Sequence, residues 1–532
     1  MFGKTRLVRQ LLEPAAYAHE VGRIQLIETH ISWVILTGDF AYKVKKPVNL
    51  GFLDFSTLEL RRRYCEEELR VNRRTAAELY LDIVPIGEGP GGLRVGLEPA
   101  VEYAVRMRQF PHRARLDRCL QDGRLGPAEM RRLAETIARF HAALPPRRDG
   151  DPAYEVDRAT RPSRNNFTHL DPAAFDDESQ QRLAVIEAWT LQQAEALAPE
   201  FARRAREGAV RECHGDLHLE NLLLQDGRFV PFDAIEFNPD LRWIDIANDI
   251  AFLVMDLMAH ERTDLAYTAL NAWLEATGAY DSLAVMRFYL ANRSMVRAVV
   301  TAIRQRQTAA PAEGVPESDP QRSSARMDKA RYVELAASLV DTPPPRLCLM
   351  HGFSGSGKTW LSERLIGALP ALRVRSDLER KRLAGGLPGL THEQVTTGVI
   401  ESGLYGADVT ERTYGTLARH CETGLRAGFD MIADATFLRR RHRERFRELA
   451  AALGSAFVIV DCAAPPALLE QRLRQRLAKG ADASDADLAV LQHQLAHHDP
   501  LTERERERAV VLDAGGDAAA VAARIRVAAA RQ

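Results

Sequence analysis

Gly352-Phe-Ser-Gly-Ser-Gly-Lys-Thr359 is the stretch of sequence that decides the fold of the C-terminal part. It fits the pattern G-x-x-x-x-G-K-[ST] in full and follows the apolar run Arg346-Leu-Cys-Leu-Met350, which predicts a strand. Backbone N–H groups of such a glycine-rich loop wrap phosphate groups, and the dipole of the following helix favours negative charge. The sequence therefore predicts a strand, a phosphate-binding loop and a helix, in that order.

Different residues of this loop are expected to contact different parts of a bound nucleotide. We expect Lys358 to reach the β and γ oxygens, where it also assists phosphoryl transfer, and Thr359 to bind Mg²⁺ through its hydroxyl. ATP or GTP with Mg²⁺ is the predicted cofactor. The remaining positions expected around the phosphates are Gly352, Ser354, Gly355, Ser356 and Gly357.

Two acidic residues downstream are candidates for chemistry beyond nucleotide binding. Arg375-Ser-Asp-Leu-Glu-Arg380 follows the second predicted strand, and its Asp377 is placed to orient or deprotonate an acceptor hydroxyl. Phe429-Asp-Met-Ile-Ala-Asp434 indicates a third strand, which delivers the carboxylate of Asp434 to a metal ion or to the acceptor. Because a mechanical ATPase needs no acceptor site, this pair of carboxylates favours a kinase.

The spacing of Asp377 and Arg380 resembles the D-x-x-R of polynucleotide kinases and related small-molecule P-loop kinases. The resemblance spans about residues 346–515 and implies that Asp377 acts on the acceptor while Arg380 binds an acceptor anion. It also implies catalytic lid arginines, and Arg472 and Arg476 stand at i, i+4 spacing on one predicted helix. A solvated helix face is an equally good interpretation of those two arginines.

His214-Gly-Asp-Leu-His-Leu-Glu-Asn221 is the informative stretch of the N-terminal part. It places Asp216 and Asn221 five residues apart, and Asp233 follows twelve residues later. Phosphoryl transfer needs a carboxylate beside the acceptor hydroxyl, and further oxygen ligands that hold Mg²⁺ against the nucleotide phosphates. These three side chains have the chemistry for both tasks.

This segment resembles the catalytic loop H-G-D-x-x-x-x-N of the aminoglycoside phosphotransferase-like branch of the protein-kinase-like superfamily, over roughly residues 20–300. The resemblance implies that Asp216 is the catalytic base and that Asn221 and Asp233 bind Mg²⁺. It also implies a nucleotide lysine on a strand and a helix glutamate that orients it. No G-x-G-x-x-G precedes the lysine strand, so a pseudokinase that binds nucleotide without transferring phosphate stays open.

The lysine strand is expected at Phe40–Lys45, the second strand of a hairpin that turns at Thr37-Gly-Asp39. Because side chains alternate along a strand, Lys43 and Lys45 share one face, and either could hold the nucleotide. We prefer Lys43, since it completes an A-x-K pattern. Glu68 is the preferred helix glutamate, because it adjoins the apolar stripe of the next predicted helix.

Two further signals concern the elements that would position this N-terminal site. The helix after the hairpin is expected to begin at Ser56, whose S-x-x-E spacing to Glu59 is a capping-box signature. Asp245 and Asp249 are expected at the start of a helix after the metal loop. In that position they would brace the catalytic loop.

The overall composition limits the classes of protein that fit. A chain of 532 residues needs at least two cores, and 46% hydrophobic with 27% charged residues is typical of a globular protein. A net charge of −1 creates no global field toward nucleic acid or an anionic membrane. The six cysteines show no C-x-x-C pair and no metal-ligand spacing, which favours reduced thiols. Without a hydrophobic signal or a long apolar run, we expect a cytoplasmic protein that does not enter a membrane.

Breaks in composition predict where the domains begin and end. We expect an α+β bilobal kinase-like domain at 1–305, a linker and connecting helix at 306–340, and an α/β P-loop domain at 341–532. The last domain should hold a parallel sheet flanked by helices. Between 127 and 327 most segments indicate helices, with a loop and short strands at 213–233.

The predicted function is phosphotransfer at two sites, from ATP or GTP with Mg²⁺ to hydroxyl groups of small molecules. An alternative makes the C-terminal domain a 5′-hydroxyl polynucleotide kinase, and the N-terminal domain a nucleotide-sensing or regulatory pseudokinase. A run of arginines favours nucleic acid as a partner, although a solvated helix face is the better interpretation of Arg439, Arg440, Arg441, Arg443 and Arg445. The sequence does not decide the acceptor, the preferred nucleotide or the oligomeric state.

Overall fold

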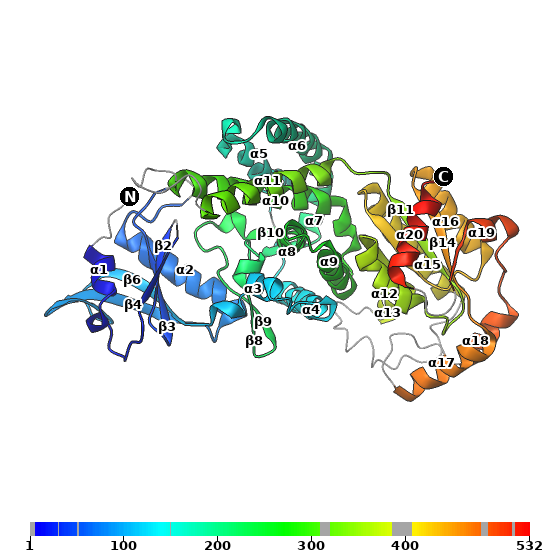
Figure 1. Cartoon of the computed structure of the whole chain (residues 1–532), viewed down its shortest axis with the longest axis horizontal. Helices are drawn as coiled ribbons and strands as arrows, with labels where there is room; N and C mark the ends of the chain where they lie inside the picture. Colours follow the sequence, from blue (N-terminus) through cyan, green and yellow to red (C-terminus); the bar gives the residue numbers. More distant parts are fainter. Residues whose placement is uncertain are drawn as a thin grey trace. The chain divides into compact units, whose positions relative to one another are not determined.

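The computed structural model describes residues 6–29, 31–49, 53–148, 150–308, 320–385, 407–479, 488–512 and 517–531. The chain divides into two compact units, and each unit draws on several segments. The first comprises Met1–Leu125, Leu144–Asp256 and Asn292–Ala336, and the second comprises Gly126–Ala143, Leu257–Ala291 and Ala337–Gln532. Figure 1 labels the elements of both units. The domain boundaries expected from the sequence, at 305 and 341, stay a prediction.

The first unit begins with a six-stranded antiparallel sheet in the order β1-β2-β3-β6-β4-β5. Its strands are β1 (Gln25–Glu28), β2 (Ser32–Leu36), β3 (Phe40–Lys45), β4 (Tyr80–Gly89), β5 (Gly92–Val95) and β6 (Ala100–Arg108). The predicted hairpin is confirmed, because β2 pairs with β3 from Ser32 opposite Lys45 to Leu36 opposite Ala41. Helix α2 (Leu58–Ala76) contacts β4 and β6 along one face of this sheet (Figure 1).

The two faces of the sheet have different neighbours. Tyr42 and Val44 of β3 belong to an apolar cluster that includes Val8 of helix α1 (Arg6–Leu11). Ala41 belongs to a separate cluster on the opposite face, together with Cys65 of α2. Because side chains alternate along β3, its two odd-numbered lysines lie on the α2 face.

Helix α2 begins one residue later than the capping-box pattern predicts. Its N-cap is Thr57, whose hydroxyl accepts a hydrogen bond from the Leu60 N–H at 3.2 Å. The expected cap, Ser56, donates its own N–H to Asp54 Oδ1 at 2.9 Å. Serine and threonine both serve well as N-caps, so two adjacent candidates compete and spacing to a glutamate does not separate them.

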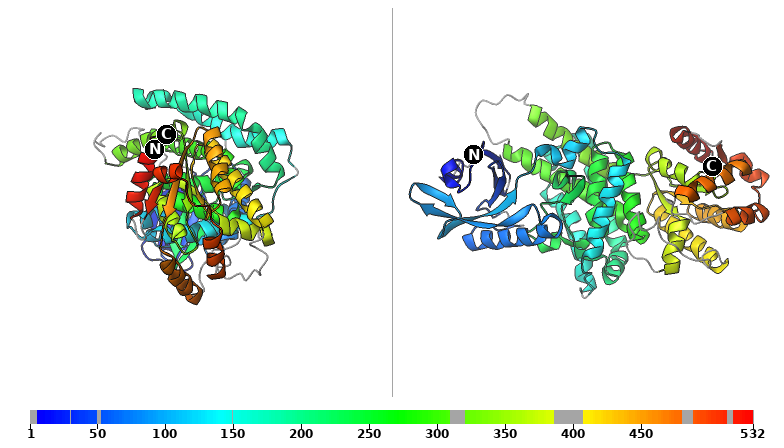
Figure 2. Two further views of the ribbon diagram at one scale, coloured as in Figure 1. Left: turned by 90° about the vertical axis from the view of Figure 1, so that its right-hand side faces the viewer. Right: turned by 90° about the horizontal axis from the view of Figure 1, so that it is seen from below.

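Helices and short strand pairs make up the rest of the first unit, as the sequence predicts. The helices are α3 (Leu116–Gln121), α5 (Pro152–His169), α6 (Asp177–Ala196), α7 (Ala198–Arg206), most of α8 (Ile246–Ala259), the second half of α10 (Leu283–Thr308) and most of α11 (Pro320–Val340). Helices α5 and α6 lie side by side (Figure 2). The strand pairs are β7 (Val210–Glu212) with β10 (Trp243–Asp245), and β8 (Leu222–Gln225) with β9 (Arg228–Pro231).

The second unit contains a five-stranded sheet in the order β12-β13-β11-β14-β15. Its strands are β11 (Arg346–His351), β12 (Ala371–Arg375), β13 (Asp430–Asp434), β14 (Ala456–Cys462) and β15 (Val510–Leu512). Every pairing is parallel, which confirms the predicted parallel sheet. The carboxyl ends of the strands therefore meet at one edge, where ligands bind in sheets of this kind.

Helices flank this parallel sheet. They are α12 (Lys358–Ala368), α13 (Ser376–Gly385), α15 (Ala407–Arg426), α16 (Arg440–Ala452), α19 (Glu503–Arg508) and α20 (Ala518–Ala529). Two further helices, α17 (Pro466–Lys479) and α18 (Leu488–Ala496), pack against each other. Met350 of β11, Leu365 of α12 and Ile525 of α20 belong to one buried apolar cluster. In the described ranges of the chain, no helix has both the length and the hydropathy that a membrane crossing requires.

Helices α4 (Pro127–Ala143) and α9 (Thr263–Thr277) also belong to the second unit. On α9, Asn271 Nδ2 donates to the Ala371 carbonyl at 3.0 Å, and the Arg373 N–H donates to Asn271 Oδ1 at 2.7 Å. Glu275 of α9 pairs with the Arg373 guanidinium at 2.7 Å. The outer edge of β12 is thereby covered by a helix from earlier in the chain, which removes a free sheet edge.

All six cysteines are free and buried. Burial is the largest influence on their thiols, and it raises the pKa of Cys65, Cys348 and Cys462 to about 12. The pKa of each remaining thiol is raised in the same direction. Since the thiolate is the reactive form, burial and the raised pKa both disfavour reaction of these thiols at neutral pH.

Candidate active sites

Asp216, the predicted base, lies in the loop between β7 and β8 with its side chain 35% exposed. Asn221 Nδ2 donates to Asp216 Oδ2 at 2.8 Å, and His218 Nε2 lies 3.2 Å from the same oxygen. Burial raises the pKa of Asp216, but His218 and then Arg297 outweigh it, so the pKa is lowered overall. The carboxylate is therefore ionised at neutral pH, as a group that orients or deprotonates a hydroxyl must be.

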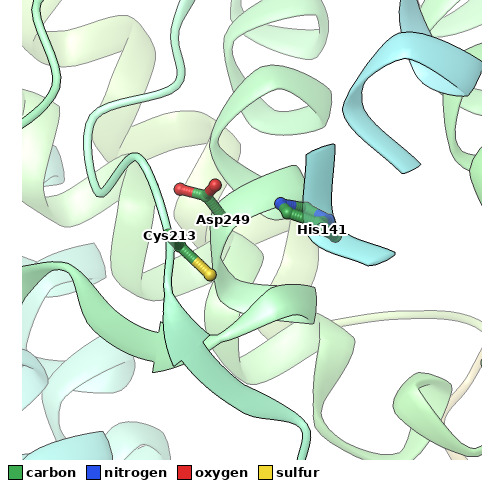
Figure 3. A group of neighbouring side chains, drawn as sticks. All are labelled: His141, Cys213 and Asp249. Carbon is green, nitrogen blue, oxygen red and sulfur yellow. The ribbon is translucent and has the colours of Figure 1, made fainter. Parts of the chain in front are cut away.

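An aspartate of α8 holds the catalytic loop by its backbone. The two oxygens of Asp249 accept from the N–H groups of His214 at 3.1 Å and Gly215 at 2.8 Å. Figure 3 shows Asp249 close to Cys213, the residue that precedes this loop. A carboxylate that accepts two backbone hydrogen bonds fixes the start of the loop in one conformation, which is the bracing role expected of Asp249.

The other two aspartates near this loop have different partners. Asp256, also on α8, accepts from the Leu219 N–H at 2.9 Å, a contact that no motif or spacing predicts. Asp245 accepts from the Ala247 N–H at 2.8 Å and pairs with Arg204 at 2.6 Å. Asp245 therefore caps and anchors α8 itself, and Asp256 is the second residue that holds the loop.

Five charged side chains meet on the α2 face of the sheet, and we call them the lysine–carboxylate cluster: Lys43, Lys45, Glu68, Asp233 and Glu236. Lys43 Nζ lies 2.7 Å from Glu68 Oε1 and 2.5 Å from Asp233 Oδ1. Lys45 Nζ lies 2.7 Å from Glu68 Oε2 and also pairs with Glu236. Glu68 therefore bridges both lysines, while Asp233 and Glu236 each pair with one of them.

Burial and charge oppose each other in this cluster. Burial by itself lowers the pKa of a lysine and raises that of a carboxyl group. For Lys43, the carboxylates of Asp233 and Glu68 outweigh burial and raise its pKa. Burial also acts on Glu68, but the two lysines outweigh it and lower its pKa to about 2. Burial dominates at Glu236, whose pKa is raised in spite of Lys45.

The structure brings the predicted residues of this site together in two groups. Asp216 contacts Asn221, and Lys43 contacts both Glu68 and Asp233. Sequence reasoning missed Glu236, although it stands three residues after Asp233. The available signal was an acidic residue in an otherwise apolar run, which indicates a buried charge that needs a partner.

In the second unit, the phosphate-binding loop connects β11 to α12 as predicted. Gly352, Gly355 and Gly357 have φ values of 138°, 84° and 95°, a region that glycine adopts without strain. A Cβ atom on Gly352 would lie 2.7 Å from the Cys462 carbonyl oxygen. Lys358 Nζ donates within the loop, to the carbonyl of Gly352 at 2.9 Å.

The two predicted acidic residues of this unit lie at the ends of two neighbouring strands, one within its strand and one just after it. Asp434 ends β13, and its Oδ2 accepts from Ser362 Oγ of α12 at 2.7 Å. Asp377 lies in the first turn of α13, directly after β12, and its Oδ1 is 3.6 Å from the Arg380 guanidinium. Because Arg375 pairs with Asp434 in the β12–β13 register, both carboxylates stand at the carboxyl edge of the sheet.

Helices α17 and α18 contact the phosphate-binding loop. Arg472 Nη1 lies 3.5 Å from the Gly355 carbonyl and 3.4 Å from that of Ser356. Gln494 of α18 accepts from the Ser354 N–H at 3.0 Å and donates to the Ser354 hydroxyl at 3.0 Å. Sequence reasoning missed Gln494, since a single glutamine carries no signal. The side chain of Arg476 lies outside the described residues.

The arginines after Asp434 have acidic partners within the unit. Arg443 is buried and pairs with Glu505 at 2.8 Å. Arg440 pairs with Glu444 at 2.8 Å, and Arg441 pairs with Glu411. Arg443 is therefore a structural residue of α16, whereas Arg440 and Arg441 make ion pairs at the surface.

Two family models match the chain. Residues 61–289 match the "Phosphotransferase enzyme family", and residues 347–501 match the "AAA domain". The first match contains the catalytic loop, and the second contains the phosphate-binding loop. The chain is therefore a nucleotide-dependent phosphotransferase, an ATP-dependent kinase in which an aminoglycoside phosphotransferase-like domain is fused to a P-loop kinase domain.

Mycobacterial relatives are similar to this chain over most of their length. "Uncharacterized protein Rv2004c" of Mycobacterium tuberculosis (strain ATCC 25618 / H37Rv) is 31% identical over 470 residues, which cover 88% of this chain and 89% of the relative. "Uncharacterized protein Mb2027c" of Mycobacterium bovis (strain ATCC BAA-935 / AF2122/97) matches with the same identity and coverage. The chain belongs to the family of these mycobacterial proteins.

Solved structures resemble parts of the chain. A choline/ethanolamine kinase family protein from Mesorhizobium loti has a TM-score of 0.35 and 13% identity, over 63% of this chain and 99% of that one. A sugar kinase from Janibacter sp. HTCC2649 has a TM-score of 0.26 and 19% identity, over 35% of this chain and 94% of that one. Both TM-scores are low, so neither likeness bears on the function of this chain.

Proposed function

We propose that both sites transfer the γ-phosphoryl group of ATP, with Mg²⁺, to hydroxyl groups of small molecules. In the first unit, Asp216 orients or deprotonates the acceptor hydroxyl, and Lys43, oriented by Glu68, holds the nucleotide phosphates. The observation that carries this proposal is the double contact of Lys43, at 2.7 Å from Glu68 and 2.5 Å from Asp233. It joins the phosphate-binding lysine to a carboxylate that is suited to a metal ion.

The residues of the first unit suit Mg²⁺ by their chemistry. Asp233 and Asn221 offer side-chain oxygens, the ligands that Mg²⁺ prefers, and the Asp233 side chain is 40% exposed. When bound, Mg²⁺ supplies positive charge that neutralises the phosphates during transfer. Asp233 also has a φ of 60°, an uncommon conformation for a residue other than glycine that is often found at functional sites.

In the second unit, we assign nucleotide binding to the phosphate-binding loop and Lys358, and metal binding to Thr359 and Asp434. Asp377 acts on the acceptor hydroxyl and Arg380 binds an acceptor anion. The position of Asp377 and Asp434 at the ends of adjacent strands supports this assignment, because ligands of parallel sheets bind at that edge. Arg472 acts as a lid arginine, supported by its contacts with two carbonyls of the loop. Arg476 keeps the same predicted role.

Small molecules are the preferred acceptors for both sites. The net charge of −1 gives no general attraction to a polyanion, and three arginines of α16 are already paired with carboxylates. The alternative, a 5′-hydroxyl polynucleotide kinase in the second unit with a regulatory first unit, predicts salt-sensitive binding of oligonucleotides.

A transfer experiment tests the proposal. ATP with a radioactive γ-phosphate is offered with a mixed pool of sugars, nucleosides, aminoglycosides and oligonucleotides to the wild type, Asp216→Asn, Lys358→Ala and the double variant. Two acceptors, one lost in each single variant, are the expected result, and the double variant controls for contaminating kinases. Labelling of oligonucleotides alone, unaffected by Asp216→Asn, would overturn the proposal in favour of the alternative.

A further inference from the structure

We infer that Lys45 and Glu236 are positioning residues of the N-terminal site. Their buried ion pair holds Glu68 on one side and the loop of Asp233 on the other, so that Lys43 is shared between Glu68 and Asp233. This inference rests on the proposed nucleotide site and deepens it. Neither residue needs to touch the nucleotide, since both act through Lys43 and its partners.

The path of the chain supports this role. Asp233 and Glu236 belong to one loop, three residues apart. Between them, the Ala234 N–H donates to Asn72 Oδ1 of α2 at 2.8 Å. The loop is thus tied to α2 through Asn72 and to β3 through the pair of Lys45 and Glu236. The Asp233 N–H also donates to the Tyr80 hydroxyl at 3.1 Å, so loss of the second tie would loosen the loop on the Glu236 side without releasing it.

The arrangement of charges supports it as well. The lysine–carboxylate cluster contains two lysines and three carboxylates, so one negative charge is in excess. Lys45 and Glu68 are wholly buried and Glu236 is 5% exposed, whereas the Asp233 side chain is 40% exposed. A buried charge without a partner is strongly destabilising. The excess charge therefore belongs on the exposed Asp233, where a cation binds, as long as Lys45 neutralises the interior.

Removing Lys45 would change this distribution. Lys43 would then be the one cation of the cluster left to neutralise both Glu68 and Glu236. It would therefore be drawn away from Asp233 toward the interior. Replacing Glu236 removes a carboxylate instead of a lysine, but it disturbs Lys43 as well. Lys45 would then pair with Glu68 alone and weaken the hold of Glu68 on Lys43. Both changes are expected to reduce the binding of MgATP and to make that binding need more Mg²⁺.

The test uses the full chain with Lys358→Ala, in which the N-terminal site reports nucleotide binding. Isothermal titration with ATP is done at a series of Mg²⁺ concentrations. The proteins compared are this parent and three variants of it that also carry Lys45→Met, Glu236→Gln or Lys45→Arg. We expect about a ten- to hundredfold loss of affinity for the first two, as for other groups that orient metal-binding residues. The Mg²⁺ concentration that gives half-maximal ATP binding should rise in the same two variants. Lys45→Arg, which keeps the charge, should restore most of the affinity.

A matched control comes from Arg61 of α2 and Glu102 of β6, which form a buried ion pair with an N–O distance of 2.8 Å. Their side chains are 9% and 5% exposed. Glu102→Gln is expected to lower Tm without changing the Mg²⁺ dependence. If Lys45→Met and Glu236→Gln behave like this control, the inference is wrong and the pair only stabilises the fold. If the Lys358→Ala parent binds no ATP at any Mg²⁺ concentration, the nucleotide site itself is overturned, and the inference with it.

Discussion

Asp216 keeps its charge in a confined loop because the groups around it favour the ionised form. His218 lies 3.2 Å from its carboxylate, and Asn221 donates to the same oxygen. The loop itself is fixed by Asp249 and Asp256 through three backbone hydrogen bonds. The position of the carboxylate is thus set by residues that would not touch an acceptor.

Replacing Asp216 by Asn should therefore remove chemistry and leave binding in place. We expect the rate of N-terminal transfer to fall by about 10²- to 10⁴-fold, because the amide cannot take up a proton. Nucleotide affinity should stay within about twofold, since Asp216 has no assigned contact with phosphate. Steady-state and binding measurements on both proteins check this, with the exposed Asp226→Asn on the β8–β9 turn as the control. A parallel loss of binding would contradict it.

Glu212 makes stability depend on pH. It pairs with Arg70 at 2.5 Å and with Arg242 at 3.0 Å, and its side chain is 13% exposed. Burial raises its pKa, but the arginines outweigh burial and lower the pKa from 4.5 to about 2. A lowered folded-state pKa gives stability that is present above pH 4.5 and is lost as the pH falls toward 2.

Glu212→Gln should accordingly cost on the order of 2 kcal/mol at neutral pH. The difference in Tm between wild type and variant should shrink as the pH is lowered from 4.5 toward 2, because the wild-type carboxylate becomes protonated. Thermal unfolding at a series of pH values measures this difference. A difference that stays constant across that range would show that the ion pairs of Glu212 contribute nothing.

At the scale of elements, local sequence signals predicted the secondary structure well, whereas contacts between distant parts of the chain were not predicted. The β2–β3 hairpin and the phosphate-binding loop follow from turn and glycine patterns within a few residues of one another. The contact of Glu236 with Lys45 joins residues 191 positions apart, and that of Gln494 with Ser354 joins residues 140 apart. No periodicity links such positions, so only the folded chain brings them together.

Asn271 of α9 completes the edge of β12 with a donor and an acceptor. Asn271→Ala would leave a buried carbonyl and a buried N–H of that strand without this partner. We expect the second unit to lose roughly 1–3 kcal/mol of unfolding free energy for each group left unpaired. Urea unfolding, followed by a probe in the second unit, measures the loss. An unchanged midpoint would mean that water replaces the amide at no cost.

Gln494 of α18 holds Ser354 through two hydrogen bonds and so preorganises the phosphate-binding loop. Gln494→Ala is expected to weaken nucleotide binding by the second unit about fivefold, the equivalent of one ordinary hydrogen bond. Titration of ATP in a Lys43→Ala background checks it, with the exposed Gln492→Ala on the same helix as the control. Tighter binding by Gln494→Ala would reverse the interpretation and make the glutamine a competitor of the nucleotide.

At the scale of the whole molecule, the two units do not follow the order of the sequence. The second unit takes 126–143 and 257–291 from the part of the chain that also carries the first family match. Residues of α9 cover β12, the strand that leads to Asp377. The P-loop part of the chain therefore depends on helices that a division by motifs assigns to the other kinase.

Fragments of the chain test this dependence. We expect fragment 341–532 to unfold at a lower urea concentration than fragment 257–532, because the shorter one exposes the edge of β12. The shorter fragment should also associate more, which light scattering would detect. Equal midpoints and equal scattering would show that the motif-based boundary is also the folding boundary.

The burial of all six cysteines has a practical consequence. With every native thiol shielded and its pKa raised, a maleimide reagent at neutral pH should leave the wild-type chain unlabelled. A single cysteine introduced at an exposed position, such as Asp226→Cys or Gln492→Cys, would then be the one attachment point for a fluorophore. The fold thus offers a clean background for optical probes of either kinase site, without prior removal of any natural residue.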